Sequence, residues 1–393
     1  MFENKKRGIK KVVSSYLVNV LVVSIILLIG WYLASWYPFG DSTFIFRDLQ
    51  EQYLGFYEHF NNVLRGDESF MYSMYKGLGG SMYGLWTYYL LSPFNLIFLF
   101  FNGNNIITGV HMVYILKLLA MTVTATYYFN KKSVRQPLSM ILTLGWVFSG
   151  YIIQYRIHLM WLDALILLPL LVYALEEGLK KGRYVKFTIL LTLTIFTNYY
   201  VGYMVGIFTV IYTLYMYLIK GDDQKLYIWG YIKNCLYSGV MSLVILVPTA
   251  YEVFNGNGQG ATQYRLFNTF SWDGLLVNFR FVDLSYDGFS KGAPLLSMGT
   301  AALILLVLVF IGVERKYKKA FVTVVLVYLL SFIISPLSLI WTMGRYETGN
   351  LYRYSFTLLL SPSLNTLPIL GVITVPREVT NVKHILTTFS ACS

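Results

Sequence analysis

Residues 12–36 read VVSSYLVNVLVVSIILLIGWYLASW, a run without a single charged side chain. About 20 consecutive apolar residues in a helix cross the hydrocarbon core of a bilayer, so this run predicts a membrane-spanning helix. Further apolar runs follow at residues 106–129, 137–154, 164–175, 185–219, 235–254, 295–313, 320–341 and 356–375. The chain is therefore predicted to be an all-α polytopic membrane protein with about ten crossings.

The composition excludes a large soluble enzyme, because 56% of the residues are hydrophobic and only 13% are charged. An ordinary soluble domain has roughly 25% charged residues. The net charge of +12 comes from short basic clusters between apolar runs, as the positive-inside rule expects, so nucleic-acid binding is not predicted. The 2 cysteines provide neither a disulfide framework nor a thiolate metal site.

The basic clusters predict the topology. Lys5, Lys6 and Arg7 precede an apolar run too long for a signal-peptide core, so the first helix is expected to stay as an anchor with a cytoplasmic N-terminus. Residues 185–219 would be about 52 Å long as one helix. A hairpin with a turn near Asn198 keeps the later basic clusters on the cytoplasmic side. For the same reason, residues 85–101 are predicted to be an interfacial or re-entrant segment, interrupted at Ser92.

The expected organisation is one transmembrane domain over residues 1–375 and a short cytoplasmic tail over residues 376–393. Three irregular segments are predicted to face outward and to carry the function: residues 38–83, 255–294 and 342–355. In the first of them, a turn is followed by an amphipathic, interfacial helix from about Leu49 to Leu64.

Two carboxylates of the first outer segment are candidate catalytic groups. Asp48 and Gln52 are four residues apart and are expected to share a helix face. Asp48 either caps the helix that begins at Leu49 or acts as a general base on a sugar or polymer hydroxyl. Asp41 either fixes a turn or takes the same catalytic role.

Three further candidates lie near or within the apolar runs. His158 and Asp163 fall in a brief outward turn, where His158 either anchors the interface beside Trp161 or, with Asp163, orients a substrate or the base. Lys117 falls near the middle of an apolar run, where an unpaired charge costs ~2.5 kcal/mol or more. It must therefore face a cavity that binds a ligand or form a structural ion pair within the bundle.

Arginines of the third outer segment are candidate phosphate ligands. Arg345 and Arg353 carry planar guanidinium groups, which suit a phosphate. Arg353 either contacts a lipid-linked substrate specifically or extends to the lipid phosphates without specificity. The 4 histidines have no metal-ligand spacing and no nucleotide-binding glycine loop is present, so neither a metal nor a cofactor is expected.

Five groups of short motifs follow one another along the chain. They are Gly40-Asp41 with Asp48-Leu49 and Gln52-Tyr53; Gly77-Leu78-Gly79-Gly80 with Tyr88-Tyr89 and Ser92-Pro93-Phe94-Asn95; Trp161-Leu162-Asp163 with Leu168-Pro169; Asn198-Tyr199-Tyr200 with Gly202-Tyr203-Met204; and Tyr352-Arg353-Tyr354-Ser355-Phe356. Together they resemble the YfhO family of bacterial multispanning proteins, which is related to the GT-C glycosyltransferases.

The resemblance implies a GT-C-like helical bundle in the bacterial plasma membrane. It also implies a glycosyltransferase that moves a sugar from an undecaprenyl-phosphate carrier, a membrane lipid, to a cell-envelope polymer acceptor such as a teichoic acid. Asp48 is then the expected base, with Asp41 second. The expected substrate-binding residues are Gln52, Tyr53, Lys117, His158, Asp163, Arg345 and Arg353.

The chain departs from the family pattern at its C-terminal end. Family members run to roughly double its length, and none of its 34 tyrosines follows Tyr354. We therefore expect a truncated or frameshifted member, which would leave the polypeptide partly folded and inactive. The rival functions are a transporter or lipid flippase and a non-enzymatic envelope scaffold. A transporter is expected to place polar groups near the middle of the membrane on discontinuous helices, whereas the charged and aromatic groups here gather in the outer segments.

Overall fold

The structure, a computed structural model, describes residues 2–74, 76–101, 103–255, 266–268, 294–297, 304, 314–345 and 350–358, without the side chains of residues 2–11 and 104. The predicted crossings at residues 295–313 and 356–375, the outer segment at residues 255–294 and the tail at residues 376–393 lie wholly or mostly outside this description. The described part is helical apart from one two-stranded hairpin.

The α-helices are α1 (Phe2–Leu33), α2 (Leu54–Arg65), α3 (Tyr83–Leu85), α4 (Ile106–Lys131), α5 (Leu138–Val147), α6 (Gly150–Gln154), α7 (Leu162–Lys181), α8 (Val185–Thr197), α9 (Tyr199–Ile219), α10 (Ile228–Met241), α11 (Leu243–Asn255), α15 (Arg315–Ile333) and α16 (Ser335–Trp341). The remaining elements are the π-helices η1 (Leu49–Tyr53) and η2 (Trp86–Leu90), the 3-10 helices η3 (Pro93–Phe100), η4 (Gly103–Asn105) and η5 (Leu159–Trp161), and the strands β1 (Tyr72–Ser73) and β2 (Gly80–Ser81).

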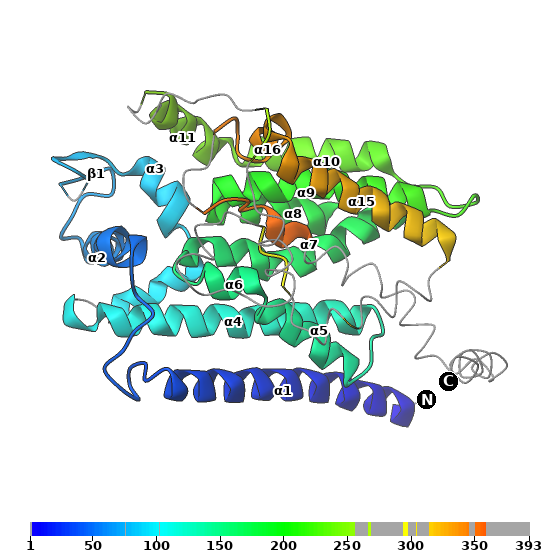
Figure 1. The fold of residues 1–393 in the computed structure, drawn as a ribbon, viewed down its shortest axis with the longest axis horizontal. Coiled ribbons are helices and arrows are strands. Elements are labelled where there is room, and N and C mark those ends of the chain that lie inside the picture. The colour runs from blue at the N-terminus through cyan, green and yellow to red at the C-terminus, as the bar shows by residue number, and fades with distance from the viewer. Residues whose placement is uncertain are drawn as a thin grey trace.

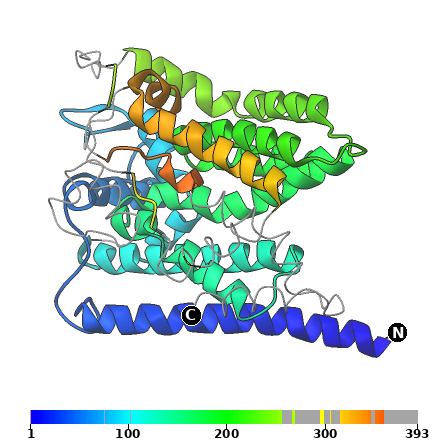
Figure 2. The same cartoon turned by 45° about the vertical axis from the view of Figure 1, so that its right-hand side comes forward.

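The long helices lie side by side in layers (Figures 1 and 2). α1 packs on α4, α4 on α7, α7 on α8, α8 on α9 and α10, and α9 on α15. The most apolar window of η5 and α7 is 83% buried, against 22% for α1. α7 therefore forms the centre of the bundle, and α1 lies at its periphery.

Four described helices are long and apolar enough to cross a membrane: Val12–Leu33 of α1, α4, α7 with η5, and α9. The pair α10 and α11 is a fifth candidate, bent by 66°. The prediction of an all-α polytopic membrane protein is confirmed. Its helix boundaries are partly wrong, because three predicted crossings are each divided into two helices: α5 and α6, α10 and α11, and α15 and α16.

The predicted hairpin within residues 185–219 is confirmed. α8 ends at Thr197 and α9 begins at Tyr199, while Asn198 between them is extended at φ −163° and ψ 108°. The Asn198 side chain accepts a hydrogen bond from the Val201 N–H at 2.9 Å, which satisfies a free donor of the new helix. A Cβ at Gly202 would lie 2.7 Å from Cα of Ile195, so glycine permits the two helices to approach closely.

The segment at residues 85–101 is interrupted where predicted. η2 ends at Leu90, Ser92 is extended, and η3 begins with Pro93. The Asn95 amide donates to the carbonyls of Tyr89 and Leu90 at 3.2 and 3.0 Å, which satisfies two acceptors at the end of η2. Its interfacial or re-entrant placement stays a prediction.

Residues 38–83, the predicted first outer segment, contain the predicted helix, which is formed by η1 and α2 and ends at Gly66, whose φ is 88°. β1 and β2 then form an antiparallel hairpin, and Gly77 and Gly79 turn the chain between them with positive φ. In Figure 1, α2, β1 and α3 gather at the end of the bundle opposite the N-terminus. This end carries the candidate site.

Candidate functional site

Aromatic side chains from several elements meet at this end of the bundle. We define the aromatic cluster as Tyr53 of η1, Tyr88 and Tyr89 of η2, His158 and Trp161 before α7, and Tyr200 of α9. The ring centroids of Tyr53 and Tyr89 are 5.0 Å apart, and those of Tyr88 and Tyr89 are 4.6 Å apart. Segments more than a hundred residues apart in the sequence thus form one cluster of rings, of which Tyr88 and Tyr89 are partly exposed.

Arg353 lies against this cluster. Its Cζ is 5.3 Å from the Trp161 ring centroid and 5.7 Å from that of Tyr200, distances at which a cation is attracted to an aromatic face. Its Nε donates to the Asn350 carbonyl at 3.1 Å. The half-buried guanidinium is therefore oriented by the protein itself.

His158 is buried between the cluster and the bundle. Its ring stacks on Trp161 at a centroid distance of 4.1 Å, and its Nδ1 lies 3.0 Å from the Tyr53 hydroxyl. Burial, and then the nearby charge of Arg353, lower the pKa of His158 to about 3. The imidazole is consequently neutral at physiological pH.

Asp48 stands at the start of η1, where its exposed side chain makes no capping hydrogen bond. In this π-helix the Leu54 N–H bonds to the Leu49 carbonyl, five residues back. The wider turn places Tyr53 beside Asp48, and the Tyr53 hydroxyl donates to Asp48 Oδ2 at 3.4 Å. Gln52, which was expected to share a helix face with Asp48, is exposed, as Asp48 is.

Tyr89 links the two charges of the site. Its pKa is raised, mainly by burial, then by Tyr88 and by the Asp48 carboxylate, and the Arg353 charge opposes this shift. The Tyr89 hydroxyl therefore lies within electrostatic reach of both Asp48 and Arg353. The charges of a solvent-exposed carboxylate and an oriented guanidinium therefore act on the same tyrosine.

Lys117 and Asp163 form a buried ion pair next to the cluster. The distance from Lys117 Nζ to Asp163 Oδ2 is 2.5 Å, and Lys117 also donates to the Leu159 carbonyl at 2.9 Å. Ser92 Oγ donates to Asp163 Oδ1 at 2.9 Å. The pair thus joins α4, the start of α7 and the break between η2 and η3. This is the arrangement of a structural ion pair within the bundle.

The other predicted residues lie apart from these contacts. Asp41 is exposed in the turn after α1, and no contact within the described ranges joins it to the aromatic cluster. Arg345 is exposed, and its charge reaches the Tyr199 hydroxyl at the start of α9. Among the residues that the structure describes, no group of three or more His, Cys, Asp or Glu could hold a metal ion.

Sequence reasoning did not assign site roles to Tyr88, Tyr89, Trp161 and Tyr200. Each of them falls within one of the motifs that resemble the family, and these motifs could have identified them as site residues. Aromatic residues are frequent throughout the chain, at 18%, so their composition alone does not distinguish a site from lipid-facing surface.

The fold and the cluster define a multi-pass membrane protein with a polar and aromatic site at one end of its helical bundle. A family model described as "Bacterial membrane protein YfhO" matches residues 19–388, and the chain belongs to this family. The family prediction is thus confirmed.

One curated relative, "Uncharacterized protein YfhO" of Bacillus subtilis (strain 168), is 31% identical over 111 residues. This alignment covers 26% of the chain but only 13% of the relative's length. No solved structure matches the chain.

Proposed function

We propose that the chain is a membrane glycosyltransferase that moves a sugar from an undecaprenyl-phosphate carrier to a cell-envelope polymer of the teichoic-acid type. The observation that carries this proposal is that Asp48 and Arg353 both contact the aromatic cluster: Asp48 accepts a hydrogen bond from Tyr53, and Arg353 lies against Trp161 and Tyr200. A carboxylate suits the acceptor hydroxyl, a guanidinium suits the carrier phosphate, and aromatic faces suit a sugar ring.

In the proposed reaction, the acceptor hydroxyl oxygen forms a bond to the anomeric carbon of the donor. The bond between this carbon and the phosphate oxygen breaks, and the electron pair leaves with undecaprenyl phosphate. Asp48 takes the acceptor proton, and Arg353 balances the negative charge on the leaving phosphate. Inverting transfer of this kind requires no covalent nucleophile.

Tyr53 and His158 would orient the base. The Tyr53 hydroxyl has one proton, so when it donates to Asp48 it accepts from His158 Nδ1–H. The buried Lys117–Asp163 pair would hold the His158–Trp161 turn in place rather than touch the substrate.

Gln52 and Arg345 are exposed at the same end and remain proposed contacts for the acceptor and the donor. Asp41 is the second candidate for the base.

We further propose that the protein lies in the bacterial plasma membrane with its N-terminus in the cytoplasm and the aromatic cluster outside. Two observations support this orientation. α2 and α3, which adjoin the η1 and η2 helices of the site in the chain, lie at the end of the bundle opposite the N-terminus (Figure 1). α7, which begins at the site, ends in the basic residues Lys180 and Lys181.

A transporter or lipid flippase is the second candidate, favoured by the break between α10 and α11 at an angle of 66°. Discontinuous helices of this kind line the substrate sites of many transporters. Glycosyl transfer is preferred because the described charged and aromatic groups meet at the end of the bundle rather than at this break.

The proposal is tested by binding of undecaprenyl phosphate to the full chain in nanodiscs. Arg353→Ala should weaken binding roughly 10- to 150-fold, because a charge-assisted contact of ~1.5–3 kcal/mol is lost. Arg353→Lys should restore part of the lost affinity. Arg65→Ala, which removes an arginine of α2 from the same end of the bundle, serves as the control. Equal affinity of the wild type and Arg353→Ala would contradict the proposed phosphate site, and carrier translocation without sugar transfer would favour the second candidate.

A further inference from the structure

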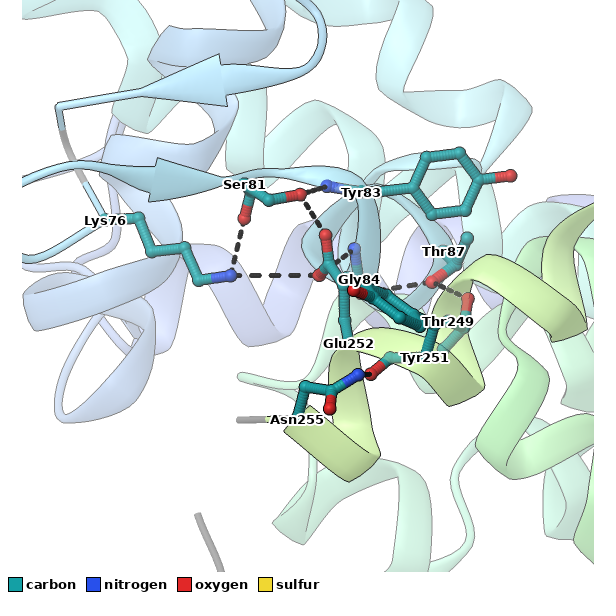
Figure 3. A network of polar contacts seen from close by, with 9 residues as sticks. All are labelled: Lys76, Ser81, Tyr83, Gly84, Thr87, Thr249, Tyr251, Glu252 and Asn255. Carbon is teal, nitrogen blue, oxygen red and sulfur yellow. Dashed lines mark hydrogen bonds and ion pairs between the residues drawn. The ribbon is translucent and has the colours of Figure 1, made fainter. Parts of the chain in front are cut away.

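Glu252 connects α11 to the β1–β2 hairpin and α3 (Figure 3). Its Oε2 accepts a hydrogen bond from the Gly84 N–H at 2.8 Å, and its Oε1 accepts from Ser81 Oγ. Lys76 Nζ lies 3.8 Å from Oε2 and adds an ion pair. Both carboxylate oxygens are therefore engaged in contacts with the β1–β2 hairpin and α3.

Gly84 is required for this contact. A Cβ built at this position would lie 2.6 Å from Glu252 Oε2, closer than real Cβ atoms come to a neighbour. A side chain at residue 84 would therefore displace the carboxylate from the backbone N–H. The hydrogen bond between Gly84 N–H and Glu252 therefore depends on both residues.

Two further hydrogen bonds join α11 to the same segment. Thr249 Oγ1 donates to Thr87 Oγ1 at 2.8 Å, one turn before Glu252. The Tyr83 hydroxyl donates to the Val244 carbonyl at 2.7 Å. Pro248 has no N–H with which to satisfy this carbonyl within α11, so Tyr83 supplies the missing donor.

These contacts end where the site begins. Thr87 belongs to η2, and the next two residues of η2 are Tyr88 and Tyr89 of the aromatic cluster. Tyr89 packs on Tyr53, which contacts Asp48. Tyr88 accepts a hydrogen bond from Trp161, against which Arg353 lies. A helix far along the chain thus fixes the position of rings that pack on the contacts of the two proposed reactive groups.

We infer that Glu252 is a positioning residue that fixes η2, and with it Tyr88 and Tyr89, for binding of the lipid-linked phosphate. The ligand in this inference rests on the proposed function, whereas the mechanical coupling of α11 to η2 does not. Glu252 itself has no reactive role, because its oxygens are engaged by Ser81, Gly84 and Lys76.

The coupling is tested first by amide hydrogen exchange over residues 72–91 in the full chain in nanodiscs. Glu252→Ala should accelerate exchange of this segment, and Gly84→Ala should do the same by displacing the carboxylate. Asn255→Ala is the matched control, since Asn255 lies one turn further along α11 and donates only to the Tyr251 carbonyl among the contacts described. Unchanged exchange in both Glu252→Ala and Gly84→Ala would overturn the inference.

A disulfide between α11 and η2 tests whether Glu252 positions η2 or contacts the ligand itself. The Thr87 and Thr249 hydroxyl oxygens are 2.8 Å apart, which makes a disulfide between Thr87→Cys and Thr249→Cys feasible. The background carries Cys235→Ser and Cys392→Ser. Glu252→Ala should weaken undecaprenyl phosphate binding about 10-fold, oxidation of the introduced pair should restore it, and reduction should abolish the rescue.

The outcomes distinguish this inference from the proposed function. Faster exchange with unchanged binding of undecaprenyl phosphate would overturn the positioning role, while Arg353 remains testable by itself. Absence of binding in the wild type would overturn the proposed ligand, while the exchange measurements still decide whether Glu252 fixes η2. Loss of binding in Glu252→Ala that oxidation does not rescue would show that Glu252 contacts the ligand directly, which also contradicts the inference.

Discussion

Asp48 and Tyr53 are five residues apart within one π-helical turn, and the Tyr53 hydroxyl lies 3.4 Å from Asp48 Oδ2. The same hydroxyl is 3.0 Å from His158 Nδ1. An exposed carboxylate is thereby connected to a buried, neutral imidazole. The Asp48 side chain makes no capping hydrogen bond, so Asp48 is not a helix cap.

Asp48→Asn should lower sugar transfer by roughly 10²-fold or more if Asp48 is the base. Asparagine keeps the shape of the side chain but cannot take the acceptor proton, so the affinity for undecaprenyl phosphate should not change. Transfer is measured with the wild type and the variant at equal protein concentration. Asp41→Asn is the matched control, and a fully active Asp48→Asn together with an inactive Asp41→Asn would move the base to Asp41.

Lys117→Met should destabilise the protein by about 3–5 kcal/mol, because the buried Asp163 carboxylate would lose the positive charge that compensates it and keep only the Ser92 hydroxyl as a partner. The double variant Lys117→Met with Asp163→Leu should recover most of this loss, since neither charge remains. Unfolding of the purified protein in detergent measures the difference. A double variant as unstable as the single one would show that the pair is not the reason for the effect.

The stability of the protein should fall as the pH is lowered from 7 to 5, and His158 should account for part of the fall. Its pKa is lowered to about 3 in the folded protein, against about 6.5 in an unfolded chain. The unfolded state therefore binds a proton between these values and the folded state does not, so the contribution of His158 is present above pH 6.5 and is lost towards pH 3. At pH 5 the loss is about 2 kcal/mol.

His158→Phe keeps a ring to stack on Trp161 and removes the titrating group. The decrease in melting temperature between pH 7 and pH 5 should be smaller in this variant than in the wild type. Identical decreases would mean that His158 does not titrate in this way.

The proposed orientation predicts opposite labelling of two exposed positions. A cysteine at Asp67 should react with an impermeant thiol reagent in intact cells, and one at Lys181 should react only after the cells are opened. Both side chains are exposed in the structure, so protection reports the membrane and not burial. Protection of the cysteine at Asp67 in intact cells would reverse the orientation.

The sequence predicted the helical architecture and the hairpin at Asn198, because long apolar runs and a polar residue within one of them are local signals. The bend between α10 and α11 was missed. Ser242 interrupts an apolar run too mildly to predict it, and the Tyr83 hydroxyl that holds the Val244 carbonyl comes from a residue 161 positions away.

The candidate site was predictable only in part. Asp48, Tyr53 and Arg353 were named from motifs and His158 from its place in a brief turn, and the structure brings them together around the aromatic cluster. The π-helical turn that pairs Asp48 with Tyr53 has no sequence signal that we recognise. Glu252 was missed because a single acid at the end of an apolar run resembles an ordinary interfacial residue.

The Lys117–Asp163 pair also bears on how the chain enters the membrane during synthesis. The two residues are 46 positions apart, so Lys117 leaves the ribosome well before its partner. Until they meet, the charge of Lys117, near the middle of α4, opposes insertion of that helix by ~2.5–3.5 kcal/mol. α4 should therefore remain beside the translocon until α7 has been synthesised. The two helices would then enter the lipid together, and this step would form the centre of the bundle.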